Sequence, residues 1–87
     1  MCQSGETRIA LIGIIVEDGA ATDRINALLH QCAAWIVGRM GVPYRQKGVS
    51  IISVVIDAPG DVISTLAGRL GSLTGVSVKT IYAPSAK

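Results

Sequence analysis

Two segments of the chain are hydrophobic on both faces when they are read as β-strands. Side chains of a strand alternate between its two faces, yet apolar residues fill both sets of positions in Arg8 to Glu17 and in Val49 to Asp57. An antiparallel sheet with one solvated face alternates apolar and polar side chains instead. We therefore expect both faces of each strand to be packed against other protein surface.

The residues after the first of these strands predict a turn and an amphipathic helix. Asp18 and Gly19 break the strand, and either Asp18 or Thr22 can cap the helix that follows. The apolar positions recur at the i, i+3, i+4, i+7 spacing of one helix face. They are Ile25, Leu28, Leu29 and Cys32. A further strand is predicted from Ala34 to Val42, and residues 43–48 turn the chain.

The second half repeats this order after the strand that ends at Asp57. Ala58 to Asp61 open a second helix, in which Pro59 is tolerated at the first turn and Gly71 is the expected C-cap. Its apolar stripe has the same spacing and consists of Ile63, Leu66, Ala67 and Leu70. A last strand is predicted from Val76 to Ala83.

Two β-α-β units joined by a hairpin predict an α+β, ferredoxin-like βαββαβ sandwich. Right-handed crossovers place both helices on one face of a four-stranded antiparallel sheet. The two most hydrophobic strands should then be central, with the other two at the edges. The face away from the helices would still present Ile9, Leu11, Ile15, Ile51 and Val55. Because such a patch is unusual on a monomer, we expect a homo-oligomer, dimer or tetramer, that buries this open sheet face.

Length and composition agree with a small self-associating domain. The 87 residues are interpreted as one domain over 1–87, with its core at 8–83 and short polar tails. Apolar residues make up 49% and charged residues only 16%, below the usual share of about a quarter. The net charge of +2 comes from basic residues spread along the chain, so no direct DNA binding is expected.

No segment has the pattern of a membrane-spanning helix or of a signal peptide. The apolar run Ile9 to Val16 is shorter than the roughly 20 residues of a bilayer span. Glu17 and Asp18 follow it where a signal peptide would have small residues. Cys2 and Cys32 do not form a disulfide framework. A cytoplasmic location is expected.

The sequence contains no pattern that indicates catalysis, a metal site or a cofactor. His30 and Cys32 lie two apart on a helix, which points them to different sides. We interpret Cys32 as a core residue and His30 as a surface residue. The thiol of Cys2 lies in a terminal tail without an activating environment. Catalytic residues, metal ligands and cofactors are therefore not expected.

Charged and aromatic residues gather near the hairpin between the second and third strands. Arg39, Tyr44 and Arg45 are the candidates there, with Lys47 beside them. In one interpretation they bind a small anion or a partner protein, with Arg39 offering its bidentate guanidinium. In the other they are a solvated, charged strand edge that discourages unwanted pairing.

The segment IGIIVEDGAATDRINALL, followed by the split βαβ layout, resembles an ACT-type regulatory domain. More specifically, IVGRMGVPYRQKGVSIISVVI followed by ISTLAGRLGSLTGVSVKT resembles the family of iron-only hydrogenase system regulators. That family is ACT-like and similar to the C-terminal domain of the nickel-responsive repressor. The resemblance covers about Arg8 to Ala83, and Gly38 to Pro43 is its most specific part.

The resemblance implies an oligomer of ferredoxin-like subunits with a regulatory, non-enzymatic role. It places a ligand-contacting turn at Asp18 and Gly19, where Asp18 could pair with the amine of a small ligand at a subunit interface. An ordinary turn with Asp18 as N-cap explains the same residues. The alternative function is a ligand-free assembly or partner-binding protein of metalloenzyme maturation. Seven residues before the first strand leave no room for the repressor's DNA-binding module, and one histidine provides no His-rich nickel site.

Overall fold

The computed structural model describes residues 6–84, so Cys2 lies outside the described residues. Its strands are β1 (Arg8–Val16), β2 (Ile36–Tyr44), β3 (Val49–Ala58) and β4 (Val76–Tyr82). Its helices are α1 (Thr22–Gln31) and α2 (Gly60–Gly71). Three 3-10 turns lie between them, namely η1 (Gly19–Ala21), η2 (Ala33–Trp35) and η3 (Arg45–Lys47).

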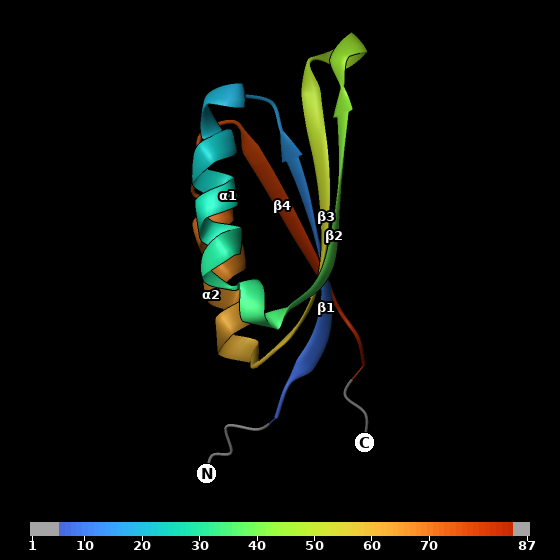
Figure 1. Cartoon of the computed structure of the whole chain (residues 1–87), viewed down its shortest axis with the longest axis vertical. Coiled ribbons are helices and arrows are strands. Elements are labelled where there is room, and N and C mark those ends of the chain that lie inside the picture. The colour runs from blue at the N-terminus through green and yellow to red at the C-terminus, as the bar shows by residue number, and fades with distance from the viewer. Residues whose placement is uncertain (1–5, 85–87) are drawn as a thin grey trace.

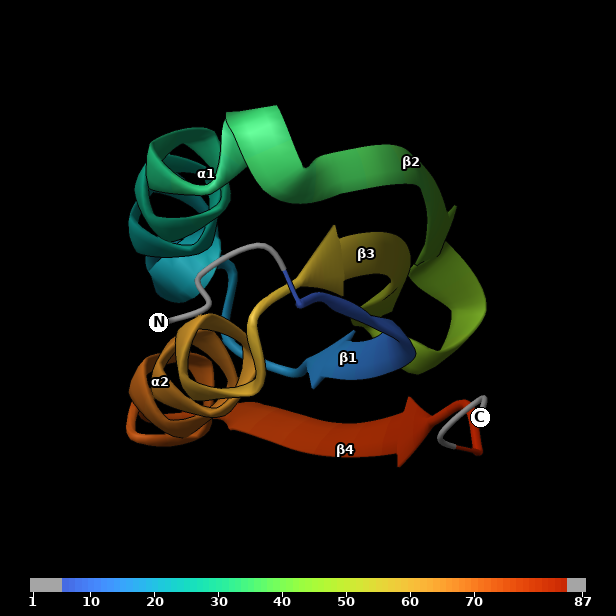
Figure 2. The ribbon, with the colours of Figure 1, turned by 90° about the horizontal axis from the view of Figure 1, so that it is seen from below.

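The four strands form one antiparallel sheet in the order β2-β3-β1-β4. Both hydrophobic strands, β1 and β3, are central, and β2 and β4 are the edges (Figure 1). Both helices lie on the same side of the sheet, α1 toward β2 and α2 toward β4 (Figure 2). The predicted ferredoxin-like fold and strand order are confirmed.

The core lies between the sheet and the two helices and is entirely apolar in the described residues. Alternate residues of β1 and β3 face the helices, as the period of two in a strand requires. The helices contribute the residues of their predicted stripes. Ile25 and Leu29 of α1 are buried, as are Ile63, Leu66 and Leu70 of α2. Leu28 and Cys32 pack against this core and are partly buried.

Several element boundaries differ from the sequence-based expectation. β1 ends at Val16 rather than Glu17, and β4 ends at Tyr82 rather than Ala83. The strand predicted to start at Ala34 begins at Ile36, because the chain leaves α1 through η2, and it continues to Tyr44. Pro43 was expected in the turn but belongs to β2, an edge strand, which is where a sheet tolerates the missing N–H of proline. Gly71 is the last residue of α2, and its C-cap is Ser72.

The side of the sheet away from α1 and α2, here called the open face, carries most of the exposed apolar side chains. Residues 6–84 have eleven exposed large apolar side chains, and all but Trp35 and Val37 lie on this face. They are Ile9, Leu11, Ile15, Met40, Val42, Tyr44, Ile51, Val55 and Ile81. The five open-face residues predicted from strands one and three are all confirmed as exposed.

Candidate functional site

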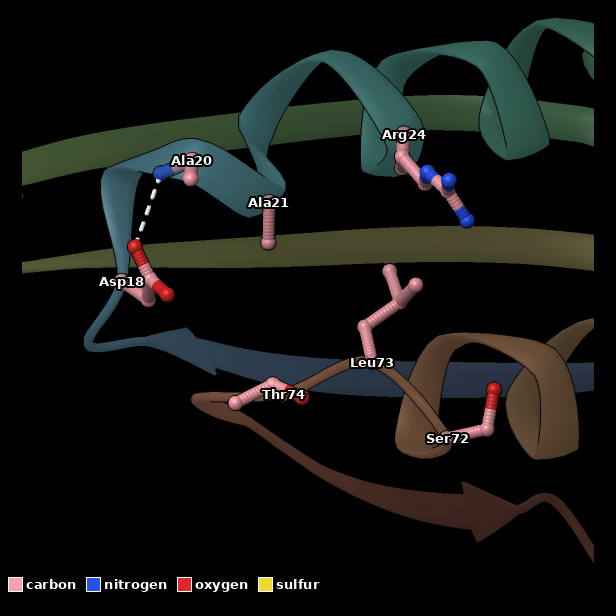
Figure 3. A pocket seen from close by; sticks show the side chains of 7 residues that line it. All are labelled: Asp18, Ala20, Ala21, Arg24, Ser72, Leu73 and Thr74. Carbon is pink, nitrogen blue, oxygen red and sulfur yellow. Dashed lines mark hydrogen bonds between the residues drawn. The ribbon is translucent and has the colours of Figure 1, made fainter.

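The turn after β1 forms one wall of a pocket of about 280 Å³. The opposite wall is the loop between α2 and β4 (Figure 3). The lining residues are Asp18, Ala20, Ala21, Arg24, Ser72, Leu73 and Thr74. An acid and a base therefore line the same small cavity, together with the hydroxyl groups of Ser72 and Thr74.

Asp18 is held in place by the turn that follows it. Its Oδ1 accepts a hydrogen bond of 2.9 Å from the backbone N–H of Ala20 and so caps η1 (Figure 3). The N-cap residue of α1 itself is Ala21, which has no capping side chain. Because a carboxylate has two acceptor oxygens, Oδ2 of Asp18 can accept from a second donor.

Gly75, rather than Gly19, is the glycine that the geometry of this turn requires. Gly75 has a φ of +77°, and a Cβ there would lie 2.5 Å from the Cβ of Asp18. Its carbonyl also accepts a hydrogen bond of 2.7 Å from the N–H of Glu17. Gly19 has no positive φ, and a Cβ there would meet nothing within 4 Å. The close approach that demands glycine is therefore between the α2–β4 loop and Asp18.

The residues predicted at the second hairpin lie on different sides of the sheet. Arg39 is paired with Val54, whose side chain is buried beneath the helices, so Arg39 projects toward α1. Tyr44 is paired with Val49 and lies on the open face, 42% exposed. Arg45 begins η3 at the tip of the hairpin. Arg39 and Tyr44 therefore contribute to two separate surfaces.

Other features of the described residues bear on binding. No group of three or more His, Cys, Asp and Glu side chains that could hold a metal occurs in residues 6–84. None of the helices in that range is long and apolar enough to cross a membrane. His30 is exposed and Cys32 is a free, partly buried thiol, as the helix pattern predicted.

Sequence reasoning missed the three polar residues that line the pocket together with Asp18. Arg24 lies on the solvated side of the helix pattern, and Ser72 and Thr74 lie in a loop near the other end of the chain. Nothing in the local pattern links them to Asp18. The one available signal was Gly75, because a glycine just before a strand can mark a turn with positive φ.

Comparison with known proteins identifies a family and a number of similar solved structures. The family model TM1266-like, described as "Iron-only hydrogenase system regulator, putative", matches residues 8–80. The uncharacterized protein TM1266 of Thermotoga maritima is 36% identical and superposes with a TM-score of 0.85. That match covers 88% of this chain and 98% of the other. No curated protein matches the chain.

More distant structures share the fold. The C-terminal domain of the MgtC protein from Mycobacterium tuberculosis is 15% identical, with a TM-score of 0.70. That match covers 99% of this chain and 98% of the MgtC domain. A formyltetrahydrofolate deformylase from Pseudomonas putida KT2440 is 18% identical, with a TM-score of 0.62. That match covers 87% of this chain but 29% of the deformylase. These likenesses concern the fold alone.

Proposed function

We propose that this chain, which belongs to the TM1266-like family of iron-only hydrogenase system regulators, is a non-enzymatic regulatory module that works as a homo-oligomer. The observation that carries the proposal is the open face. Nine large apolar side chains are exposed there on one side of a four-stranded sheet. An apolar surface of this kind on a small domain marks an interaction site.

The distribution of large and small side chains on the open face suits packing against a second copy of the same face. Residues directly opposite each other on neighbouring strands form rows across the sheet. The middle row contains Met40, Ser53, Gly13 and Lys79. The small residues Ser53 and Gly13 are at its centre, and the rows on either side carry larger side chains. Those rows contain the pairs Ile15–Ile51 and Leu11–Val55. In a two-fold dimer the same patch serves both copies, so the larger side chains of one copy can pack against the small middle-row residues of the other.

The pocket at Asp18 supports a sensing role. It is lined by η1, the first turn of α1 and the α2–β4 loop, at one end of the helix layer. Within the pocket, the Asp18 carboxylate can accept from an amine and the Arg24 guanidinium can donate to a carboxylate. A small zwitterionic metabolite fits this pair of charges.

The non-enzymatic part of the proposal rests on where the polar residues lie. All buried side chains among residues 6–84 are apolar. The candidate residues Asp18 and Arg39 are exposed. Catalytic groups are usually tuned by burial and by close charged neighbours, and a surface site of this kind is better suited to reversible binding.

Sedimentation equilibrium tests the assembly. We expect the chain to sediment as a dimer or tetramer across the micromolar range. Association removes apolar surface from water, which stabilises the assembly by about 25 cal/mol for each Å² that is buried. A well-behaved monomer at high concentration would contradict the proposed function.

A thermal-shift screen with amino acids and nucleotides tests the ligand. At ten times its Kd a ligand stabilises the native state by about 1.4 kcal/mol, which raises the Tm of a domain of this size by about 5 °C or more. The variant Asp18→Asn should abolish the shift, because the amide can still cap η1 through its oxygen but carries no charge. Asp23→Asn is the matched control, since Asp23 is an exposed acid outside the pocket.

A flat thermal response from an intact oligomer would favour the alternative function. The protein would then be a ligand-free assembly or partner-binding protein of metalloenzyme maturation. That function predicts a stoichiometric protein partner when the chain is purified from its native host.

A further inference from the structure

A cleft of about 370 Å³ lies between α1 and the edge strand β2, away from the Asp18 pocket. We propose that it binds a small organic anion through a carboxylate or phosphoryl group. Figure 2 shows α1 standing over the β2 side of the sheet, where this cleft is formed. The residues that line it are Asn26, Leu29, His30, Ala33, Ile36 and Arg39.

Arg39 is the principal anion-binding group. Its position opposite the fully buried Val54 directs it to the helix side of the sheet. There its Nη2 donates a hydrogen bond of 3.0 Å to Oδ1 of Asn26. A guanidinium has five N–H donors in a fixed plane, so this bond orients the group while other donors stay available. An oriented guanidinium matches the two oxygens of a carboxylate or phosphate.

The other polar groups of the cleft are also donors. Because guanidinium can only donate, Asn26 must turn its oxygen toward Arg39, which leaves its NH2 group to donate elsewhere. His30 lies one helical turn after Asn26 on the same side of α1, and its imidazole N–H is a further donor. No acidic side chain lines the cleft. This set of donors selects an anion over a cation.

The remaining lining residues explain why we expect an organic anion rather than an inorganic one. Leu29, Ala33 and Ile36 form an apolar side next to the donors. A bare phosphate would leave that side in contact with water. An organic anion can place its charged group on Arg39 and its carbon skeleton against the apolar residues, which is the usual arrangement in small-molecule sites.

A titration of the full chain followed by NMR tests this site with succinate, glycerol 3-phosphate and inorganic phosphate as probes. We expect saturable shifts at Asn26, His30 and the Arg39 side chain with succinate or glycerol 3-phosphate. The variant Arg39→Gln should weaken binding about tenfold or more, because a charge-assisted hydrogen-bond pair is lost. Arg39→Lys, which keeps the charge but not the fork, should bind with intermediate affinity.

Arg69→Gln is the matched control, since it removes the same charge from α2, away from the cleft. Equal weakening in Arg39→Gln and Arg69→Gln would show general charge attraction and overturn the site. Chemical shifts that do not saturate with any of the three probes would overturn the site too. Equal affinity for glycerol 3-phosphate and inorganic phosphate would overturn the role of the apolar lining residues. The cleft is on the helix side of the sheet, opposite the open face, so binding there can be measured whether or not the chain assembles through that face.

Discussion

Replacing Ile15 by glutamate is expected to convert the assembled protein into a folded monomer. Ile15 lies opposite Ile51 on the open face, and its side chain is 44% exposed in the isolated subunit. In a two-fold interface the substitution places a carboxylate from each copy in an apolar contact. Desolvating unpaired charges in this way costs several kcal/mol, so the dissociation constant should rise about a hundredfold or more.

The measurement is sedimentation equilibrium of Ile15→Glu beside the unmodified chain. Ala27→Glu is the control, because it adds the same charge to an exposed position of α1 on the far side of the molecule. Circular dichroism should show that both variants stay folded, since neither position is in the core. If both variants sediment like the unmodified chain, the open face is not the assembly surface.

The fold was predictable because its strongest determinant is local in the sequence. Two strands that are apolar on both faces had to be central, and the helix stripes around Ile25 and Ile63 identified which faces pack on them. The ends of β2 were harder to predict. Pro43 suggested a turn, but proline is compatible with an edge strand, and only the pairing with β3 shows that the strand continues past it.

The candidate sites were predictable only in part, because their residues meet through the tertiary structure. Asp18 was identified because the resemblance places a ligand-contacting turn there, whereas its neighbours across the pocket come from the α2–β4 loop. Arg39 was identified as a charged hairpin residue. Its hydrogen-bond partner Asn26, 13 residues earlier, is a polar residue outside the apolar stripe of the first helix. The spacing of apolar residues in the helix does not show that Asn26 faces an edge strand.

The two faces of β1 differ in burial, as the neighbouring residues Ile14 and Ile15 show. Ile14 is fully buried between the sheet and the helices, opposite Ile52 and Val78. Its replacement by alanine removes several packed methyl and methylene groups and leaves a cavity. We expect Ile14→Ala to lower the free energy of unfolding by about 2–5 kcal/mol. That is a large part of the 5–15 kcal/mol typical of a domain.

Urea unfolding at several protein concentrations distinguishes the two residues. Ile14→Ala weakens the subunit itself, so it should lower the midpoint by a similar amount at every concentration. Ile15→Ala should act mainly through association, because assembly stabilises the native state by mass action. Its effect should grow with protein concentration and vanish where the chain is monomeric. If the loss in Ile15→Ala were as large at low concentration as that in Ile14→Ala, the open face would be part of the subunit's own core, and the separation of the two faces would fail.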